Sequence, residues 1–398
     1  MQLSIQQAQA KDKVVEWYNG GASSPQVFRL FGYAGTGKTT IAKDVVASLS
    51  ARAVFGAYTG KAASVLRKKG NPANTIHSLI YKVDEPDEEK IHDLKQKLEE
   101  CKVPALRKTL QREFEEANKP TFSLRDKNEL KDIDLIVIDE VSMVGEQLGQ
   151  DLLSFGKKIL VLGDPAQLPP IDGGGFFTSA KPDFLLTEIH RQARDNPIIT
   201  MATLVRQGHR LKKGSYGNSK CIDRREENEN PKDFEQLIVG LNRTRKAWNT
   251  RYRDLFGWTS STPEQGEKVI CLKNNKEHGL LNGTQWRVAQ AEDRGYAIAM
   301  EIFPWEEEYD PTKRGLLVEA HQFDTDFKQL MWYERSKAEE FDFGYAITCH
   351  KAQGSQWKTV YIANESYVFA GRNGKPDYSR NWLYTALTRA EERVVVAL

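Results

Sequence analysis

The 398-residue sequence is poor in cysteine and has no long apolar segments. Its four cysteines stand far apart and form no CxxC pair, which argues against a disulfide scaffold and against a cysteine zinc site. No run of about 18 apolar residues occurs, and the first residues form no apolar signal core, so we expect no membrane association. A reducing, cytoplasmic setting is the corresponding expectation.

The sequence also lacks an excess of charge of one sign. Its 57 lysines and arginines are balanced by 55 aspartates and glutamates, which leaves a net charge of +2. This balance excludes a protein that holds nucleic acid by overall positive charge, but it allows a local basic groove. Residues 205–253 carry 13 basic and 6 acidic side chains, whereas residues 287–345 carry 14 acidic and 7 basic ones. The basic stretch either flanks a nucleic-acid path or forms a solvated helical face.

What the sequence does contain is a series of short apolar runs, with helical patterns between them. Runs of this length that are rich in valine and isoleucine indicate buried strands of a parallel sheet. They lie at residues 27–31, 53–58, 135–138, 159–162, 237–241, 268–272, 359–363 and 394–397. An early set ends near residue 162 and a late set begins near 237. We therefore predict an α/β protein with two tandem domains, each built on a parallel sheet.

Two segments interrupt this pattern. Residues 82–132 hold 26 charged side chains, and their apolar residues at helical spacing predict two helices. Residues 287–342 alternate apolar and polar residues between glycines and prolines, which predicts a small β insert. The predicted first domain then comprises residues 1–81 and 133–180, and the second comprises residues 181–286 and 343–398. For the charged insert, a solvated helix pair without a function is an equally good interpretation.

A phosphate-binding motif follows the first apolar run. Residues 32–40, GYAGTGKTT, match GxxxxGK[ST] with a strand pattern before and a helical pattern after. The glycines let backbone N–H groups wrap a phosphate, and the N-terminus of the helix attracts the same anion. Lys38 can reach the β- and γ-phosphates, and Thr39 can bind Mg²⁺. ATP and Mg²⁺ are therefore the expected ligands.

Two later strands end in polar residues that complete such a site. Residues 135–138 are followed by Asp139 and Glu140. We expect Asp139 to hold the metal and Glu140 to orient or deprotonate the attacking water. The run at 159–162 leads into GDPAQLPP, in which Gln167 is the candidate sensor of the γ-phosphate. Together, the phosphate loop and the acid pair predict hydrolysis of a nucleoside triphosphate.

Eight sequence blocks occur in a fixed order along nearly the whole chain. They are GYAGTGKTT (32–40), AYTGKAA (57–63), TIHSL (75–79), VIDEVSM (137–143), GDPAQLPP (163–170), LTEIHRQ (186–192), AITCHKAQGSQW (346–357) and YTALTRA (384–390). In these blocks the chain resembles the superfamily-one helicases of the RecD and Dda type, from bacteria or phages. In size and compactness it is most similar to the Dda-like phage helicases. The resemblance implies two RecA-like domains with ATP in the cleft between them, and an SH3-like fold for residues 287–342.

The resemblance also assigns contacts to the nucleotide. Gln7 lies where the family reads the adenine edge, with its neighbour Gln6 as the alternative. Arg191 and Arg389 match the two arginines that reach the γ-phosphate, where a planar guanidinium stabilises the spreading charge. Gln356 matches a ribose contact. The predicted nucleotide-binding residues are Gln7, Gly32, Ala34, Gly35, Thr36, Gly37, Lys38, Thr39, Thr40 and Gln356.

By the same resemblance, a set of polar residues contacts single-stranded DNA. The set comprises Thr59, Lys61 and His77 in the first domain, and Asn242, Thr348, His350 and Lys351 in the second. Hydroxyl, imidazole and ammonium groups suit phosphate oxygens and read no base sequence. Three tryptophans, Trp248, Trp286 and Trp357, are candidates for stacking on bases, with a place in the core as the alternative for each.

The predicted activity is that of an ATP-dependent DNA helicase that moves 5′→3′ along one strand and unwinds duplex DNA. Its expected partners are single-stranded DNA and junctions of single and double strands, and it is expected to act as a monomer. The insert at 82–132 lies where relatives carry a strand-separating β-hairpin, so Tyr81 or Phe122 is the candidate tip. Two alternatives stay open: an RNA helicase of the same superfamily, and a nucleotide-gated single-strand translocase or binding protein that does not unwind.

Overall fold

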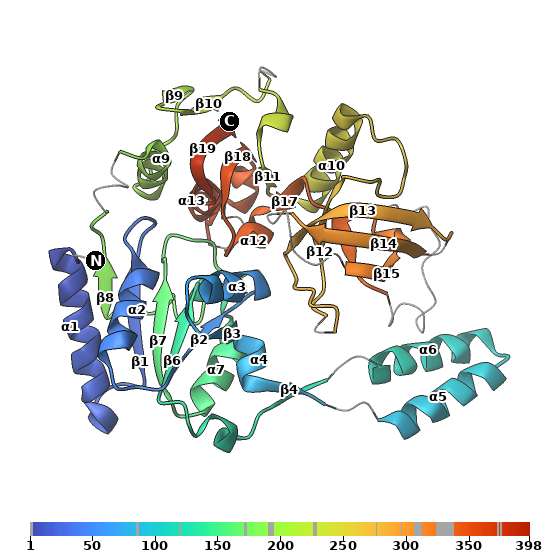
Figure 1. Ribbon diagram of the computed structural model, residues 1–398, viewed down its shortest axis with the longest axis horizontal. Helices are drawn as coiled ribbons and strands as arrows, with labels where there is room; N and C mark the ends of the chain where they lie inside the picture. The colour runs from blue at the N-terminus through green and yellow to red at the C-terminus, as the bar shows by residue number, and fades with distance from the viewer. Residues whose placement is uncertain are drawn as a thin grey trace.

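The computed structural model describes residues 3–84, 87–118, 121–170, 173–189, 195–225, 229–275, 277–295, 297–305, 313–323, 338–371, 374 and 376–398. The described residues form two six-stranded sheets, a five-stranded sheet and a two-stranded ribbon. Figure 1 shows the first six-stranded sheet below the second, with the five-stranded sheet beside them. No helix of the described residues is long and apolar enough to cross a membrane.

The first sheet is parallel throughout and has helices on both faces. Its strands, in spatial order, are β3 (Ala73–Thr75), β2 (Ala53–Ala57), β6 (Leu135–Asp139), β7 (Lys158–Gly163), β1 (Val27–Gly32) and β8 (Phe184–Leu186). Alternate residues of β6 point to opposite faces. Leu135 and Val137 pack with α1 (Ile5–Asn19), α2 (Lys38–Ser48) and α3 (Gly60–Lys68), whereas Ile136 and Ile138 pack with α4 (Ile76–Ile80) and α7 (Glu146–Ser154).

The second sheet repeats this plan near the C-terminus. Its order is β17 (Ala346–Thr348), β11 (Gln236–Val239), β18 (Trp357–Ala363), β19 (Ala390–Ala397), β10 (Ser219–Ile222) and β9 (Gly214–Tyr216), and only the β9–β10 pair is antiparallel among these described strands. One face packs on α9 (Pro197–Arg206), α12 (Cys349–Ala352) and α13 (Ser379–Leu387), and the other packs on α10 (Asn242–Phe256). The prediction of two tandem α/β domains with parallel sheets is confirmed.

The third sheet is antiparallel, and it corrects one predicted strand. Its order is β15 (Lys313–Glu319), β14 (Ala297–Pro304), β13 (Gln285–Asp293), β12 (Lys268–Cys271) and β16 (Phe341–Phe343). The sequence analysis placed the run at 268–272 with the parallel strands, and this was wrong, since β12 pairs with β13 and β16 antiparallel. A short run buried on both sides looks alike in either kind of sheet. The SH3-like fold of the insert stays a prediction.

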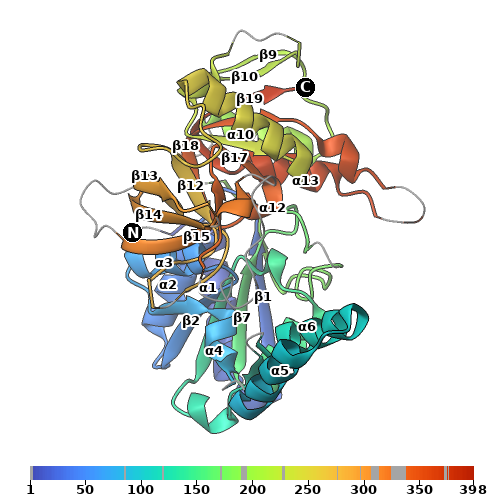
Figure 2. The ribbon, with the colours of Figure 1, turned by 90° about the vertical axis from the view of Figure 1, so that its right-hand side faces the viewer.

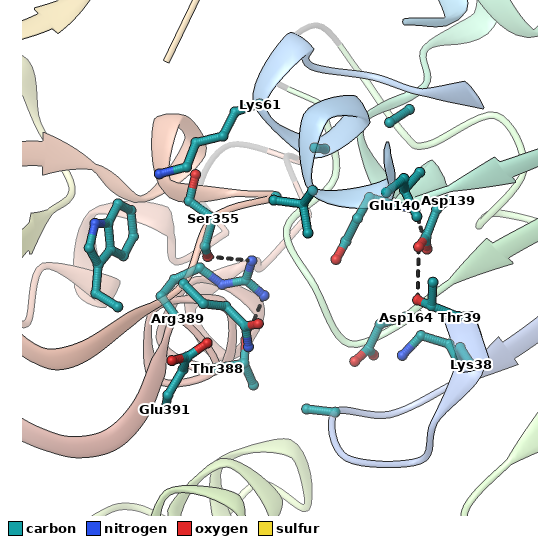
Figure 3. Close-up of a pocket in the computed structure, with 18 of the residues that line it drawn as sticks. Lys38, Thr39, Lys61, Asp139, Glu140, Asp164, Ser355, Thr388, Arg389 and Glu391 are labelled. Atoms are coloured by element: carbon teal, nitrogen blue, oxygen red, sulfur yellow. Dashed lines mark hydrogen bonds between the residues drawn. The ribbon is translucent and has the colours of Figure 1, made fainter. Parts of the chain in front are cut away.

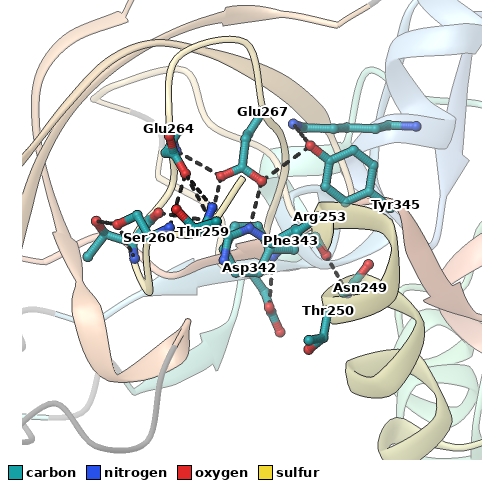
Figure 4. Close-up of polar contacts among 12 residues, drawn as sticks. Asn249, Thr250, Arg253, Thr259, Ser260, Glu264, Glu267, Asp342, Phe343 and Tyr345 are labelled. Carbon is teal, nitrogen blue, oxygen red and sulfur yellow. Dashed lines mark hydrogen bonds and ion pairs between the residues drawn. The ribbon is translucent and has the colours of Figure 1, made fainter. Parts of the chain in front are cut away.

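A buried ion-pair network joins the third sheet to α10 (Figure 4). Arg253 of α10 donates from Nε and Nη2 to the two carboxylate oxygens of Glu267, at 2.8 and 2.9 Å. Glu267 is fully buried, and the hydroxyl of Tyr345 lies 3.4 Å from its Oε1. Asn249, one turn before Arg253 on α10, donates to the carbonyl oxygen of Phe343 in β16. The insert is therefore joined to the second domain through buried polar groups.

The charged insert forms a separate arm. Strands β4 (Tyr81–Val83) and β5 (Phe122–Leu124) pair antiparallel as a short stalk that carries α5 (Glu88–Glu100) and α6 (Pro104–Asn118). The two helices pack on each other through Leu94, Leu98 and Phe114. Figures 1 and 2 both show the arm projecting away from the first sheet. The predicted helix pair is confirmed. Short 3₁₀ turns complete the described elements, at Gly21–Ser23, Lys127–Leu130, Val141–Met143, Pro231–Asp233, Ala320–Gln322 and Ser366–Phe369.

Candidate nucleotide site and nucleic-acid interface

A cleft of about 820 Å³ lies between the two parallel sheets. Its wall in the first domain comes from the loop between β1 and α2, from α3, and from the ends of β6 and β7. Its wall in the second domain comes from residues 354–358 and from the turn before β19. Figure 3 shows Lys38, Thr39 and Asp139 on one side of the cleft and Arg389 on the other. Residues far apart in the sequence thus meet in one cavity.

The loop from Gly32 to Lys38 has the backbone of a phosphate cradle. Gly35 and Gly37 have φ angles of 79° and 78°, in the left-handed region that favours glycine. A Cβ at Gly32 would lie 2.6 Å from the Thr36 hydroxyl oxygen, so the strand can turn into the loop only with glycine there. The geometry therefore requires glycine at these three positions. The N–H groups at the start of α2 can then face a phosphate.

Two side chains of α2 reach the centre of the cleft. The Lys38 ammonium donates to the carbonyl oxygens of Gly32 (2.6 Å) and Tyr33 (3.1 Å), so it lies folded over the loop. The Thr39 hydroxyl donates to Oδ2 of Asp139 at 2.9 Å. Because β1 and β6 are parallel, their carboxyl ends share one sheet edge, and this brings Thr39 and Asp139 together.

This pair fits a magnesium ion. Mg²⁺ in nucleotide sites takes one or two protein oxygens and completes its shell with phosphate oxygens and water. Within the described residues, no group of three or more His, Cys, Asp and Glu side chains could hold a metal by itself. Thr39 and Asp139 would therefore bind the ion together with a nucleotide. Burial, and then the charge of Glu140, raise the pKa of Asp139, and a bound cation would oppose both effects.

Glu140 has an unusual backbone. Its φ angle of 55° is the only positive one among the described residues other than glycine. The conformation directs the side chain into the cleft, and the Glu140 N–H donates to Oδ1 of Asp139 at 2.9 Å. Such strain in a residue that is not glycine is typical of functional positions. Gln167 also lines the cleft, and its amide oxygen accepts from the Ser142 hydroxyl at 3.3 Å.

Sequence reasoning missed a third acid in the cleft. Asp164 is buried and accepts hydrogen bonds from the hydroxyl of Tyr384 (2.6 Å) and the N–H of Ala166 (3.0 Å). Burial raises the pKa of Asp164. The Tyr384 hydroxyl in turn accepts from the N–H of Ala34 in the phosphate loop, at 2.9 Å. Asp164 and Tyr384 thus link the two domains beside the loop. The sequence signal was an acid directly after an apolar run.

Arg389 lies on the second-domain wall, with its guanidinium turned toward its own domain. It donates to the carbonyl oxygens of Thr385 and Ser355 and to the hydroxyl of Thr388, each at 3.2 Å. Gln356 lines the same wall. The other predicted arginine, Arg191, lies outside the described residues.

The other predicted nucleotide contacts fall into two groups. Ala34, Gly35, Gly37 and Thr40 line the cleft, whereas Gly32, Thr36 and Gln7 do not. Gln7 is buried, and its side-chain amide donates to the carbonyl oxygen of Thr36 at 3.1 Å, so it touches the loop from behind. Gln6 bonds instead to the backbone N–H groups of Thr187 and Glu188. The adenine-reading role of Gln7 stays a prediction.

Of the predicted strand contacts in the first domain, two lie at the ends of neighbouring strands. Thr59 follows β2 and caps α3, with its hydroxyl accepting from the N–H of Ala62 at 3.1 Å. His77 follows β3, and its ring lies 5.9 Å from that of Tyr58 and 5.8 Å from that of Tyr81. Desolvation lowers the pKa of His77, which favours the neutral form of the ring. The three rings form an aromatic surface at the base of the arm.

Lys61, the third predicted strand contact of the first domain, lies where the two domains meet, and its contact with a strand stays a prediction. It lines the nucleotide cleft, with its ammonium 5.1 Å from the centre of the Trp357 ring in the second domain. The helix α3 turns its first residues toward the other domain, which a sequence motif cannot show. Trp357 and Trp286 are both buried, which agrees with the alternative of a place in the core. Trp248 is half-buried against Tyr361.

The predicted strand contacts in the second domain come together at one sheet edge. Thr348 ends β17, and Asn242 begins α10 directly after β11, the neighbour of β17. Desolvation lowers the pKa of His350, whose ring lies 5.9 Å from that of Phe369. Lys351 is exposed, so its ammonium is accessible to a phosphate. Their contact with a nucleic acid stays a prediction.

Comparison with known proteins agrees with this arrangement. Residues 2–226 match the family described as an AAA domain, and residues 343–397 match the UvrD-like helicase C-terminal domain. The chain is 28% identical to the ATP-dependent RecD2 DNA helicase of Deinococcus radiodurans over 92% of its own length and 46% of that protein. It is 31% identical to the ATP-dependent DNA helicase dda of phage T4 over 44% of this chain and 37% of that protein. The chain therefore spans less than half the length of these relatives.

Solved structures show the same fold. A Pif1 helicase structure at forked duplex DNA superposes with a TM-score of 0.57 at 18% identity, covering 100% of this chain and 92% of that one. Pif1 from Candida albicans gives 0.52 at 18% identity, covering 100% and 95%. These likenesses identify the two parallel-sheet units as RecA-like. Since the AAA match alone takes in more than half of the sequence, the chain belongs to the AAA-domain family, and it is similar to DNA helicases of the RecD and Dda type.

Proposed function

We propose that the protein is an ATP-driven DNA helicase that moves 5′→3′ along single-stranded DNA and opens duplexes ahead of it. The observation that carries the proposal is the cleft, in which Lys38, Thr39, Asp139 and Glu140 of one domain face Arg389 of the other. A site divided in this way lets the state of the nucleotide set the distance between the domains. The curated relatives named above are DNA helicases, which supports DNA as the track.

The cleft residues account for hydrolysis as follows. The phosphates of ATP lie in the glycine loop, and the Lys38 ammonium leaves its two carbonyl partners to bind them. Thr39 and Asp139 would hold Mg²⁺, which would supply positive charge beside the phosphates. Glu140 accepts a proton from a water molecule as the water oxygen bonds to the γ-phosphorus and the bond to the β-phosphate oxygen breaks, leaving ADP and phosphate. Gln167, which lines the cleft, senses the γ-phosphate.

Arg389 links this reaction to motion. Its present partners are neutral oxygen atoms of its own domain, so a γ-phosphate within reach is a stronger, charged acceptor. Turning toward that phosphate draws the second domain over the first, and loss of the phosphate releases it. The strand contacts at Thr59 in one domain and Thr348 in the other would then move relative to each other once per ATP.

The stalk of the arm is the proposed strand-separating element. Phe122 and Val83 are paired across β4 and β5, and their side chains are 59% and 58% exposed. The Tyr81 hydroxyl donates to Asp151 at 2.5 Å, so Tyr81 is held at the base of the stalk and Phe122 is the better tip. An exposed apolar pair can replace the stacking that a base pair loses as it opens. Structures of Pif1 helicases with single-stranded and forked DNA support single strands and forks as the substrate.

The test uses duplexes with a single-stranded tail at one end. We expect unwinding with a 5′ tail and none with a 3′ tail, and ATP hydrolysis that single-stranded DNA stimulates more than RNA of the same sequence. The opposite tail preference would overturn the polarity. Stronger stimulation by RNA would favour the RNA helicase. Stimulation by DNA without any strand separation would favour a translocase that does not unwind.

A further inference from the structure

A second, smaller cavity lies at the carboxyl edge of the second sheet. Its volume is about 140 Å³, and it shares no lining residue with the nucleotide cleft. Here β11 ends at Val239 and α10 begins at Asn242, so that only Gly240 and Leu241 separate strand from helix. The first domain has the same succession of strand, turn and helix in β1, the phosphate loop and α2. The turn in the second domain is too short to form a phosphate cradle.

In the second domain, the carboxylate of Glu365 lies at the turn that corresponds to the phosphate loop of the first domain. Oε2 of Glu365 accepts hydrogen bonds from the N–H groups of Gly240 (2.7 Å) and Leu241 (3.0 Å), and its Oε1 accepts from the Thr244 hydroxyl (2.7 Å). A negative charge at this end of a helix interacts favourably with the helix dipole. A Cβ at Gly240 would lie only 2.9 Å from the Cβ of Glu365, so the close approach of the carboxylate requires glycine.

We propose that Glu365 is a positioning residue that takes the place of a bound phosphate and fixes the first turn of α10 for strand binding. The proposal rests on the proposed function, because Asn242, the first residue of α10, is a predicted strand contact. Glu365 follows β18 by two residues, and β18 begins at Trp357 in the wall of the nucleotide cleft. The strand β18 therefore connects the wall of the nucleotide cleft with Glu365. The hydrogen bonds of Glu365 to the start of α10 form without a bound nucleotide.

The same cavity supplies a matched control. Glu229 lines it with its side chain 8% exposed, but its carboxylate pairs with Lys220 and, at 2.8 Å, with Arg393. Removing either acid deletes a buried negative charge from one cavity. Of the two acids, only Glu365 bonds to the start of α10. If loss of a buried charge or of packing caused the defect, Glu365→Ala and Glu229→Ala should weaken strand binding equally.

The experiment compares Glu365→Ala, Glu365→Gln and Glu229→Ala by binding of a fluorescent oligonucleotide and by ATP hydrolysis without a strand. We expect Glu365→Ala to weaken strand binding about tenfold, since charge-assisted hydrogen bonds to the backbone are lost. Sodium formate should restore most of the affinity, because a small carboxylate can enter the vacated space. Glu365→Gln keeps an oxygen acceptor and should lose less. Strand-free hydrolysis should stay unchanged in all three, and Glu229→Ala should bind as the parent does.

Hydrogen exchange at the amides of Gly240 and Leu241 gives a readout that needs no strand. We expect faster exchange in Glu365→Ala and its reversal by formate. Glu365→Gln should show an intermediate rate, and it replaces the alanine variant in this measurement if that variant does not fold. Unchanged exchange, or a loss of strand affinity that formate does not relieve or that Glu229→Ala shares, would overturn the inference. A parent protein that binds no strand would overturn the proposed function instead, and the exchange result would still decide the role of Glu365.

Discussion

At the scale of single residues, the site depends on a few strained or buried groups. Glu140 adopts a left-handed backbone, and Asp139 beside it is buried with a raised pKa. Both carry an energetic cost, which a bound cation and phosphate would offset. Two carbonyl oxygens hold the Lys38 ammonium beside the phosphate loop, and a phosphate can replace them as its hydrogen-bond acceptor. We therefore expect these residues to contribute to turnover rather than to stability.

The first prediction concerns Lys38 and Glu140. Lys38→Ala and Glu140→Gln should each lower strand-stimulated ATP hydrolysis by roughly 100-fold or more, because one removes charge stabilisation of the phosphates and the other removes the proton acceptor. Glu140→Gln should still bind ATP, since the amide keeps the shape of the carboxyl group. Steady-state hydrolysis and nucleotide binding measure the two effects. Retention of turnover by either variant would contradict the assigned chemistry.

The second prediction concerns the four cysteines. Burial raises the pKa of the Cys221 and Cys271 thiols to about 12, and it raises that of Cys349 as well. Only Cys101, between the two helices of the arm, is partly exposed. Because the thiolate is the reactive form, a thiol reagent at pH 8 should modify one cysteine in the folded protein and four in urea. Rapid modification of more than one thiol without denaturant would show that the second domain opens readily.

At the scale of elements, the arm stands apart from the rest of the structure. Its helices α5 and α6 pack on each other around three buried residues, and among the described residues the stalk lies between them and the first domain. A core of that size adds little stability to the whole molecule. The arm can therefore contribute to substrate binding rather than to stability. We expect its apolar stalk to contact the DNA where the strands separate.

The third prediction tests the stalk. Phe122→Ala should slow unwinding of a tailed duplex several-fold while leaving strand-stimulated ATP hydrolysis unchanged, because the side chain touches the fork and not the cleft. Leu106→Ala is the matched control, since Leu106 is 53% exposed on α6 and lies away from the stalk. Equal slowing by both variants would assign the effect to the arm in general. No slowing by Phe122→Ala would exclude it as the separating tip.

At the scale of the whole molecule, the domains approach each other so closely at two glycines that a larger residue would not fit without movement of its neighbours. A Cβ at Gly354 would lie 3.1 Å from the Cβ of Ala62 across the cleft, and one at Gly60 would lie 2.9 Å from Leu281 of the loop before β13. The third sheet is tied to the second domain by the Arg253–Glu267 pair. Movement driven from the cleft should therefore carry the third sheet along with the second domain.

The fourth prediction concerns that buried pair. Arg253→Ala leaves Glu267 buried without its partner, which should lower the free energy of unfolding by about 3–5 kcal/mol. Burial already raises the pKa of Glu267, and loss of Arg253 would raise it further. A carboxyl group with a raised pKa in the folded state binds a proton on folding, so the variant should lose stability as the pH rises. Urea unfolding at pH 5 and pH 8 measures this, and the double variant Arg253→Met/Glu267→Gln should recover part of the loss.

The sequence by itself determined the local parts of this protein. The phosphate loop, the acid pair at the end of β6, and the helices of the arm follow from residues close together in the chain. Their glycines, buried runs and helical spacing act over a few residues. Eight ordered blocks were enough to predict the family and the two parallel sheets. The roles given to the strand contacts, and to Arg191, remain predictions.

Only the tertiary structure decided what depends on distant partners. The direction of β12 was set by pairing with β13 and β16, and Lys61 was placed by the way α3 meets the second domain. The bond from Tyr384 to Asp164 and the anchoring of α10 by Glu365 join residues 220 and 125 positions apart. Such contacts form when the packing of whole domains brings side chains together, and no local pattern in the chain records which partners will meet.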